Sequence, residues 1–144
     1  MTGNKVREVM TREVVTLSPT DTLLTAAQQM KARDVGSMPV CGKEGTVLGT
    51  LTDRDITIRA TAEGLDPEHT RVDSIMTRDV VCAEEDQDID DAVELMERYK
   101  VRRVPVVDKD RHLRGLFTIG KVARTEEENK ANEFLRSVTE PPVK

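Results

Sequence analysis

The chain has 144 residues and a formal net charge of −5, from 22 basic and 27 acidic side chains. It contains no block of lysines and arginines, so a nucleic-acid-binding role is not expected. No apolar run approaches the roughly 18 residues that span a bilayer, so no membrane segment is expected. The N-terminus lacks the apolar core of a signal peptide, and the two cysteines do not suggest a disulfide framework. These features predict a reduced, cytoplasmic protein.

The sequence repeats itself at a constant offset of 66 residues, without a gap, over residues 6–122. Pairs of identical residues include Met10 and Met76, Ala26 and Ala92, Pro39 and Pro105, Gly49 and Gly115, and Thr52 and Thr118. Such regularity predicts one supersecondary unit used twice, with the copies burying each other's apolar faces. We therefore predict domains over 1–66 and 67–124, followed by a tail over 125–144.

The elements of the first copy are predicted from periodicity and turn residues. A helical turn over 6–10 leads to a brief strand over 14–16. A helix then places Leu23, Ala26, Ala27 and Met30 on one face. A hairpin pairs 37–41 with 46–51, and Gly42 to Gly45 form its turn. A last helix runs from near Asp53 to about Glu63 and ends at Gly64.

The second copy repeats this β-α-β-β-α order. The corresponding segments are a helical turn over 72–76, a strand over 80–82, a helix with Ile89, Ala92, Val93 and Met96 on one face, a hairpin of 103–107 with 113–117, and a helix starting near Ile119. In the tail, Ala131, Phe134, Leu135 and Val138 share one helical face, which predicts a C-terminal helix that covers the core or docks a partner. The fold class is α/β (α+β).

The segment Gly49 to Asp55 joins a strand to a helix and carries the most informative chemistry. Free N–H groups at a helix start favour an anion such as phosphate, and the Thr52 hydroxyl adds a donor. The Asp55 carboxylate could accept hydrogen bonds from the two hydroxyls of a ribose. The alternative is structural: Thr52 caps the helix and Asp55 favours the helix dipole.

In these repeated segments the chain resembles a tandem pair of cystathionine-β-synthase-type (CBS) domains, which is called a Bateman module. The motifs that carry the resemblance are Val9-Met10-Thr11, Gly36-Ser37-Met38-Pro39-Val40 and Gly49-Thr50-Leu51-Thr52-Asp53-Arg54-Asp55, repeated as Ile75-Met76-Thr77, Arg102-Arg103-Val104-Pro105-Val106 and Gly115-Leu116-Phe117-Thr118. The segment Gly64-Leu65-Asp66-Pro67 is similar to the stand-alone, hypoxic-response type of bacterial and archaeal CBS proteins.

The resemblance implies a pseudo-twofold unit with two clefts that bind adenine nucleotides or related adenosyl ligands. It also implies that two such pairs associate into a homodimer. The first cleft would be composite. Its residues would be Thr50, Thr52, Arg54 and Asp55 from copy one, with Val80, Val81, Arg102, Arg103 and Pro105 from copy two. Neighbouring strand residues face opposite ways, so only one arginine is expected to reach the ligand.

The second cleft departs from this pattern. Thr118 is present, but Lys121 stands at the position of Asp55, and Gly36 and Ser37 replace the two arginines. A ribose acceptor is therefore missing, although Lys121 could attract an anion. We expect one strong ligand site per chain.

These features predict a regulatory ligand sensor rather than an enzyme, with no catalytic residue and no required cofactor. The ligand would be AMP, ADP or ATP, with S-adenosylmethionine and NAD left open, and the protein partner is not identified. The alternative is a constitutive dimeric interaction module without ligand. His69 and His112 lack a nucleophile partner at useful spacing. Cys41 and Cys82 could join them as zinc ligands, but small buried hydrophobes are favoured, so no metal is expected.

Overall fold

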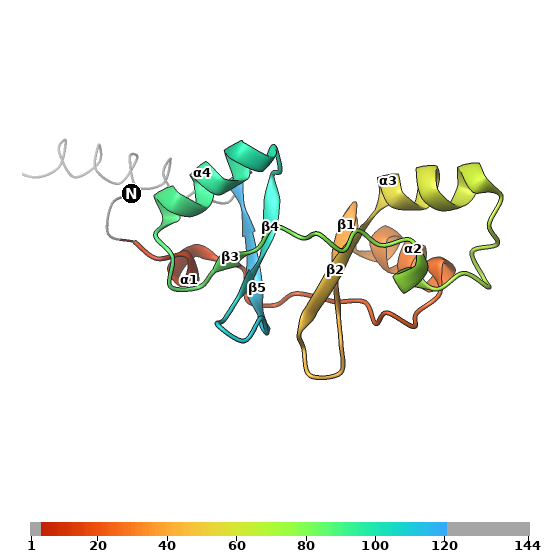
Figure 1. The fold of residues 1–144 in the computed structure, drawn as a ribbon, viewed down its shortest axis with the longest axis horizontal. Coiled ribbons are helices and arrows are strands. Elements are labelled where there is room, and N and C mark those ends of the chain that lie inside the picture. The colour runs from red at the N-terminus through yellow and green to blue at the C-terminus, as the bar shows by residue number, and fades with distance from the viewer. Residues whose placement is uncertain (1–3, 121–144) are drawn as a thin grey trace, which may run out of the picture.

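The computed structural model describes residues 4–120 and consists of two similar halves set side by side (Figure 1). The first half contains α2 (Leu23–Arg33), β1 (Ser37–Cys41), β2 (Val47–Thr52), α3 (Asp53–Asp55), the π-helical η1 (Ile56–Ala60) and the 3-10 helix η2 (Thr61–Glu63). The second half contains β3 (Ala83–Glu84), α4 (Ile89–Tyr99), β4 (Arg103–Val107) and β5 (Leu113–Thr118). The repeated order confirms the predicted α/β fold. The helix expected in the tail lies outside the described residues.

Each half is built on an antiparallel hairpin, β1 with β2 and β4 with β5. Both hairpins have a register shift at the same repeat position, between Val40 and Cys41 and between Val106 and Val107. The strands predicted over 14–16 and 80–82 precede the residues that pair in the structure. Pairing begins at Leu17, which bridges Val40, and at β3, which runs parallel to β4. The residues before these points cross from one half to the other.

The leading helical turns are exchanged between the halves. Helix α1 (Val6–Val9) begins copy one, yet Val6 lies in the buried core with Ala92 and Phe117 of copy two. The 3-10 turn η3 (Val72–Ser74) begins copy two, yet Val72 packs in the core of copy one. Figure 1 shows the red α1 beside the second half. Each hydrophobic core therefore needs residues from both sequence repeats.

The crossing segments bind the opposite hairpins through paired backbone hydrogen bonds. Thr50 and Thr77 exchange N–H···O bonds of 2.9 Å in both directions, and Thr11 and Leu116 exchange bonds of 2.8 Å. A Cβ at Gly49 would lie 2.5 Å from the carbonyl oxygen of Thr77. A residue without a side chain is required at this point, because nothing larger fits between the two backbones.

The helix after β2 begins at Asp53, runs to Glu63 and stops at Gly64, as predicted. Thr52 is the N-cap, and Gly64 has the left-handed φ of 73° that terminates many helices. Between them, η1 is a π-helical turn. Within residues 4–120, no helix has the length and apolar character to cross a membrane.

We predict that Gly49→Ala lowers the free energy of unfolding by about 1–3 kcal/mol, because the new methyl group forces the crossing segment away from β2. Urea unfolding followed by circular dichroism measures the loss. Gly42→Ala is the matched control, since its Cβ would lie at an ordinary 3.6 Å from Leu48. Equal stability of the two variants would contradict the close approach.

Candidate functional site

A cavity of about 740 Å³ opens where the two halves meet. One part of its wall is apolar and comes entirely from the second copy: Val80, Val81, Val101, Val104 and Pro105. Another part is charged: Arg54, Lys100, Arg102, Arg103, Asp53 and Asp79. The remaining wall is formed by Gly36, Ser37, Thr50, Thr52 and Thr77. The site is therefore composite, with neither copy able to form it alone.

Most of the residues predicted for the first cleft line this one cavity. They are Thr50, Thr52, Arg54, Val80, Val81, Arg102, Arg103 and Pro105. Both arginines line it, whereas strand alternation predicted only one. Because β4 begins at Arg103, Arg102 precedes the strand and is not held to the opposite face by the pleat.

Asp55 is the predicted site residue that does not line the cavity. Its carboxylate accepts the backbone N–H of Thr52 at 3.0 Å, and its own N–H donates to the Thr52 hydroxyl at 3.0 Å. The Thr77 hydroxyl donates to the same carboxylate at 3.3 and 3.4 Å. Asp55 is buried and forms a capping box with Thr52, the N-cap of the helix. Its predicted role as ribose acceptor stays a prediction.

The start of the helix offers fewer donors to an anion than the sequence suggested. The N–H of Asp53 donates to the carbonyl oxygen of Gly36 at 2.8 Å, and that of Asp55 to Thr52. A helix N-terminus attracts phosphate through its unbonded N–H groups, and two of these are used within the protein. Anion binding in this cavity therefore depends mainly on side chains.

The three threonines of the wall differ in what they can donate. Thr50 donates its hydroxyl proton to the carbonyl of Met38 at 3.2 Å, and Thr77 donates to Asp55. Thr52 accepts a hydrogen bond from Asp55, which leaves its own proton available. Thr52 is thus the threonine best placed to donate to a ligand.

Three charged residues of the wall were missed from the sequence: Asp53, Asp79 and Lys100. Lys100 could have been found, because it stands two residues before Arg102 at the end of a predicted helix. Asp79 could also have been found, since it directly precedes Val80. Asp53 was assigned only to the helix start.

A second hollow, of about 890 Å³, adjoins the first and shares Thr77 and Asp79 with it. Its arginines are bound within the protein. Arg59 donates to the carbonyls of Ile75 and Met76, and Arg71 pairs with Asp73 at 2.6 Å. By contrast, Arg54, Arg102 and Arg103 form no recorded side-chain bond with the rest of residues 4–120. Among the arginines of the two hollows, those without a side-chain partner in residues 4–120 line the smaller one.

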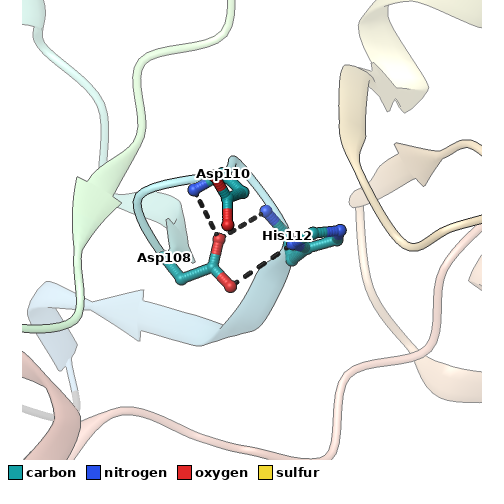
Figure 2. Close-up of side chains that lie close together, drawn as sticks. All are labelled: Asp108, Asp110 and His112. Atoms are coloured by element: carbon teal, nitrogen blue, oxygen red, sulfur yellow. Dashed lines mark hydrogen bonds and ion pairs between the residues drawn. The ribbon is translucent and has the colours of Figure 1, made fainter.

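Figure 2 shows a group of possible metal ligands in the turn between β4 and β5. Asp108 accepts the backbone N–H groups of Asp110 and His112, each at 2.9 Å, and its other oxygen lies 3.4 Å from His112 Nδ1. The backbone bond from His112 is the chief cause that lowers the pKa of Asp108. These contacts are those of a closed hairpin turn, and we assign them no metal-binding role.

The two cysteines lie against one small apolar cluster with Val47, Val107 and Leu113, where the hairpin turns meet. Burial is the main cause that raises the pKa of both the Cys41 and the Cys82 thiols. A thiol whose pKa is raised forms the metal-binding thiolate less readily. Cys41 is buried, as expected of a small hydrophobe, whereas Cys82 is half-buried. Lys121, which was predicted to lie in the second cleft, is outside the described residues.

We predict that Asp55→Ala lowers the free energy of unfolding by about 1–2 kcal/mol without any ligand, because Thr52 and Thr77 lose their acceptor. Thermal unfolding of the purified protein measures this loss. Asp53→Ala is the control: it removes a carboxylate from the same helix start, but the Asp53 side chain forms no hydrogen bond within residues 4–120. If both variants unfolded at the same temperature, the capping role of Asp55 would be wrong.

Comparison with known proteins gives the family. The CBS domain model matches residues 6–60 and 72–128. Hypoxic response protein 1 of Mycobacterium tuberculosis is 33% identical over 135 residues, which cover 94% of each chain. The crystal structure of Hypoxic Response Protein I with two coordinated zinc ions aligns at a TM-score of 0.77 and 34% identity, covering 85% of this chain and 98% of that one.

Two further structures of this kind hold adenosyl ligands. CBSX2 in complex with AMP aligns at a TM-score of 0.77 and 25% identity, covering 89% of this chain and 99% of that one. The CBS domain pair of MJ0100, in complex with 5′-methylthioadenosine and S-adenosyl-L-methionine, aligns at a TM-score of 0.75 and 25% identity. The alignment covers 88% of this chain and 98% of that one. With its two matched repeats and this paired fold, the chain belongs to the CBS-domain family.

Proposed function

We propose that this protein is a regulatory module that binds an adenine nucleotide, or a related adenosyl ligand, in the cavity between its two halves. The observation that carries the proposal is one composite cavity with an apolar wall and with arginines that have no side-chain partner within residues 4–120. The AMP complex of CBSX2 and the adenosyl complexes of MJ0100 support this ligand class.

The adenine base would lie on the apolar wall of copy two. Val104 and Pro105 are buried, and Val80 and Val81 are half-buried beside them. Ligand pockets typically combine such an apolar surface with a few polar groups that set orientation. The base would cover valine side chains that are otherwise partly open to water, and this burial would favour binding.

The phosphate would lie toward the arginines. Arg102 and Arg103 are adjacent, exposed and on the cavity wall, and a guanidinium can donate two parallel hydrogen bonds to a phosphate. The free proton of the Thr52 hydroxyl adds a neutral donor from copy one. In this arrangement the ligand contacts both copies.

The ribose would contact Asp55 only if the hydrogen bonds from the Thr77 hydroxyl to the Asp55 carboxylate were broken. Thr77 belongs to the crossing segment, and its hydrogen bonds to Asp55 are long, at 3.3 and 3.4 Å. A ribose that took over Asp55 would therefore alter the contact between the crossing segment and the helix of copy one. A ligand shifts such an equilibrium only if it binds one arrangement better than the other.

A constitutive dimeric interaction module without ligand is the alternative. In that case Thr52 and Asp55 act only as the helix cap, and the cavity stays filled with water. Neither proposal includes catalysis, and in both the assembly is a cytoplasmic homodimer whose protein partner is unknown. Sedimentation measures the dimer independently of any nucleotide.

We expect calorimetric titration with AMP, ADP, ATP and S-adenosylmethionine to give saturable binding near one ligand per chain. Arg102→Ala combined with Arg103→Ala should weaken nucleotide affinity about tenfold or more, because charge-assisted hydrogen bonds are lost. Arg98→Ala is the control, since Arg98 lies on α4 and faces Glu94 at 3.9 Å, outside the cavity. Flat titrations with an intact dimer would favour the interaction module.

A second titration tests Asp55. If Asp55 accepts the ribose hydroxyls, Asp55→Asn should weaken binding of a ribonucleotide more than binding of its 2′-deoxy analogue. An equal change for the two nucleotides would leave Asp55 with its capping role alone.

A further inference from the structure

The crossing segment from Thr77 to Val81 lies between the two hollows and contributes to both. Thr77 and Asp79 line both hollows, whereas Val80 and Val81 line the candidate cavity and Arg59 lines the larger hollow. The position of this segment sets the shape of the candidate cavity. Whatever holds the segment in place therefore also holds part of the cavity wall.

Backbone hydrogen bonds fasten the crossing segments of both copies in the same way. Thr77 exchanges two with Thr50 at 2.9 Å, and Thr11 exchanges two with Leu116 at 2.8 Å. The fold therefore attaches each segment to the opposite hairpin without the help of a side chain. A side-chain contact that only one copy can form at this place has a different purpose.

The helix of copy one forms such contacts with the start of the crossing segment. Arg59 donates from one guanidinium nitrogen to the carbonyl oxygens of Ile75 at 2.9 Å and Met76 at 3.2 Å. Asp55 stands four residues earlier, on the same face of the helix, and accepts from the Thr77 hydroxyl at 3.3 Å. Three consecutive residues, 75–77, are thus bound by one helix.

The Arg59 contact fixes the direction in which the chain leaves the first half. The Met76 carbonyl and the Thr77 N–H belong to one peptide group, which is planar. Arg59 binds the oxygen of this group, and its N–H donates to the Thr50 carbonyl at 2.9 Å. A hydrogen bond from a charged donor is stronger than one between neutral groups. The peptide group is therefore held from both sides at the point where the crossing begins.

The sequence of copy two has neither residue. At the constant offset of 66, Arg59 corresponds to Thr125 and Asp55 to Lys121. Threonine carries no positive charge, and lysine accepts no hydrogen bond, so these residues could not repeat the same contacts. Arg59 also lies in the π-helical turn η1, a rare geometry that occurs frequently at functional sites. The arginine thus belongs to the copy whose helix start borders the candidate cavity.

We propose that Arg59 is a positioning residue for the candidate cavity: through the Ile75 and Met76 carbonyls, it sets where Val80 and Val81 lie on the wall. Its effect on ligand binding rests on the proposed function, in which these valines contact the base. Arg59 lines the other hollow, so it acts on the ligand only through the backbone of the crossing segment.

The experiment compares Arg59→Ala and Arg59→Lys with a control, Arg71→Ala, in the full chain. Arg71 lines the same hollow and pairs with Asp73, so its removal takes a cation from the hollow and leaves the carbonyls of residues 75 and 76 bound. Lysine keeps a charged donor, and one ammonium can donate to two carbonyls. The backbone bonds to Thr50 remain in every variant, and circular dichroism checks that each variant folds.

The first measurement is the methyl NMR spectrum of each variant without ligand. The signals of Val80 and Val81 should shift in Arg59→Ala, because the start of the crossing segment is no longer held. They should return most of the way in Arg59→Lys and stay in place in Arg71→Ala. A role of Arg59 confined to stability would lower the unfolding temperature and leave these signals where they are.

The second measurement is calorimetric titration with AMP, ADP and ATP. If the wall is in place in about one Arg59→Ala molecule in five, the apparent affinity falls about fivefold, because only those molecules bind. Arg59→Lys should lose less than about twofold, and Arg71→Ala should lose nothing.

Unchanged methyl signals or unchanged affinity in Arg59→Ala, or equal changes in Arg71→Ala, overturn this inference and leave the proposed function standing. An unmodified protein that binds none of the three nucleotides overturns the proposed function. The methyl signals then decide the inference alone: a shift confined to Arg59→Ala supports the positioning of the segment, and unchanged signals overturn it.

Discussion

The exchange of leading turns between the two halves is the constraint on which the rest of the structure depends. The chain crosses from one half to the other after α1 and again after η3, and each crossing is fastened by a pair of backbone hydrogen bonds to the opposite hairpin. Two halves of this size would bury little surface alone. Because each core includes a turn from the other copy, the halves stabilise each other.

The same crossing creates the candidate site. The segment from Thr77 to Val81 leaves the first half beside β2 and supplies part of the wall as it enters the second half. Thr77 is bonded through its backbone to Thr50 and through its hydroxyl to Asp55. Any ligand that contacts this segment touches the connection between the cores. A change at the cavity can therefore be transmitted to the relation between the halves without a separate hinge.

The charges in and around the site divide according to whether the fold uses them. Asp55 is buried and bonded to Thr52 in the capping box, and the arginines of the adjoining hollow are bound to carbonyls or carboxylates. The cations of residues 100–103 are exposed on the cavity wall instead. Polar groups that the fold buries are hydrogen-bonded within it, whereas these cations remain accessible to solvent. This division explains why Asp55 and Arg102, both in the family pattern, have different environments.

Much of the fold could be predicted from local patterns. The apolar faces of α2 and α4, the hairpins and the stop at Gly64 all depend on neighbours close in sequence, and the 66-residue repeat shows each pattern twice. Most of the cavity wall could also be predicted, since the repeat and the family motifs identify Thr52, Val80 and Pro105. The first strands of each copy were misplaced, because nothing local distinguishes a valine that crosses between halves from one that pairs in a sheet.

The sequence by itself determined the repeat, the element order and most of the residues that line the cavity, because periodicity and motifs express these directly. Only the tertiary structure decided that the leading turns are exchanged, that Asp55 is bonded to Thr77, and that both arginines share the cavity with Lys100. These outcomes depend on contacts between residues far apart in the chain. The hydrogen bonds of Asp55 at the helix start, for example, include the Thr77 hydroxyl of the crossing segment.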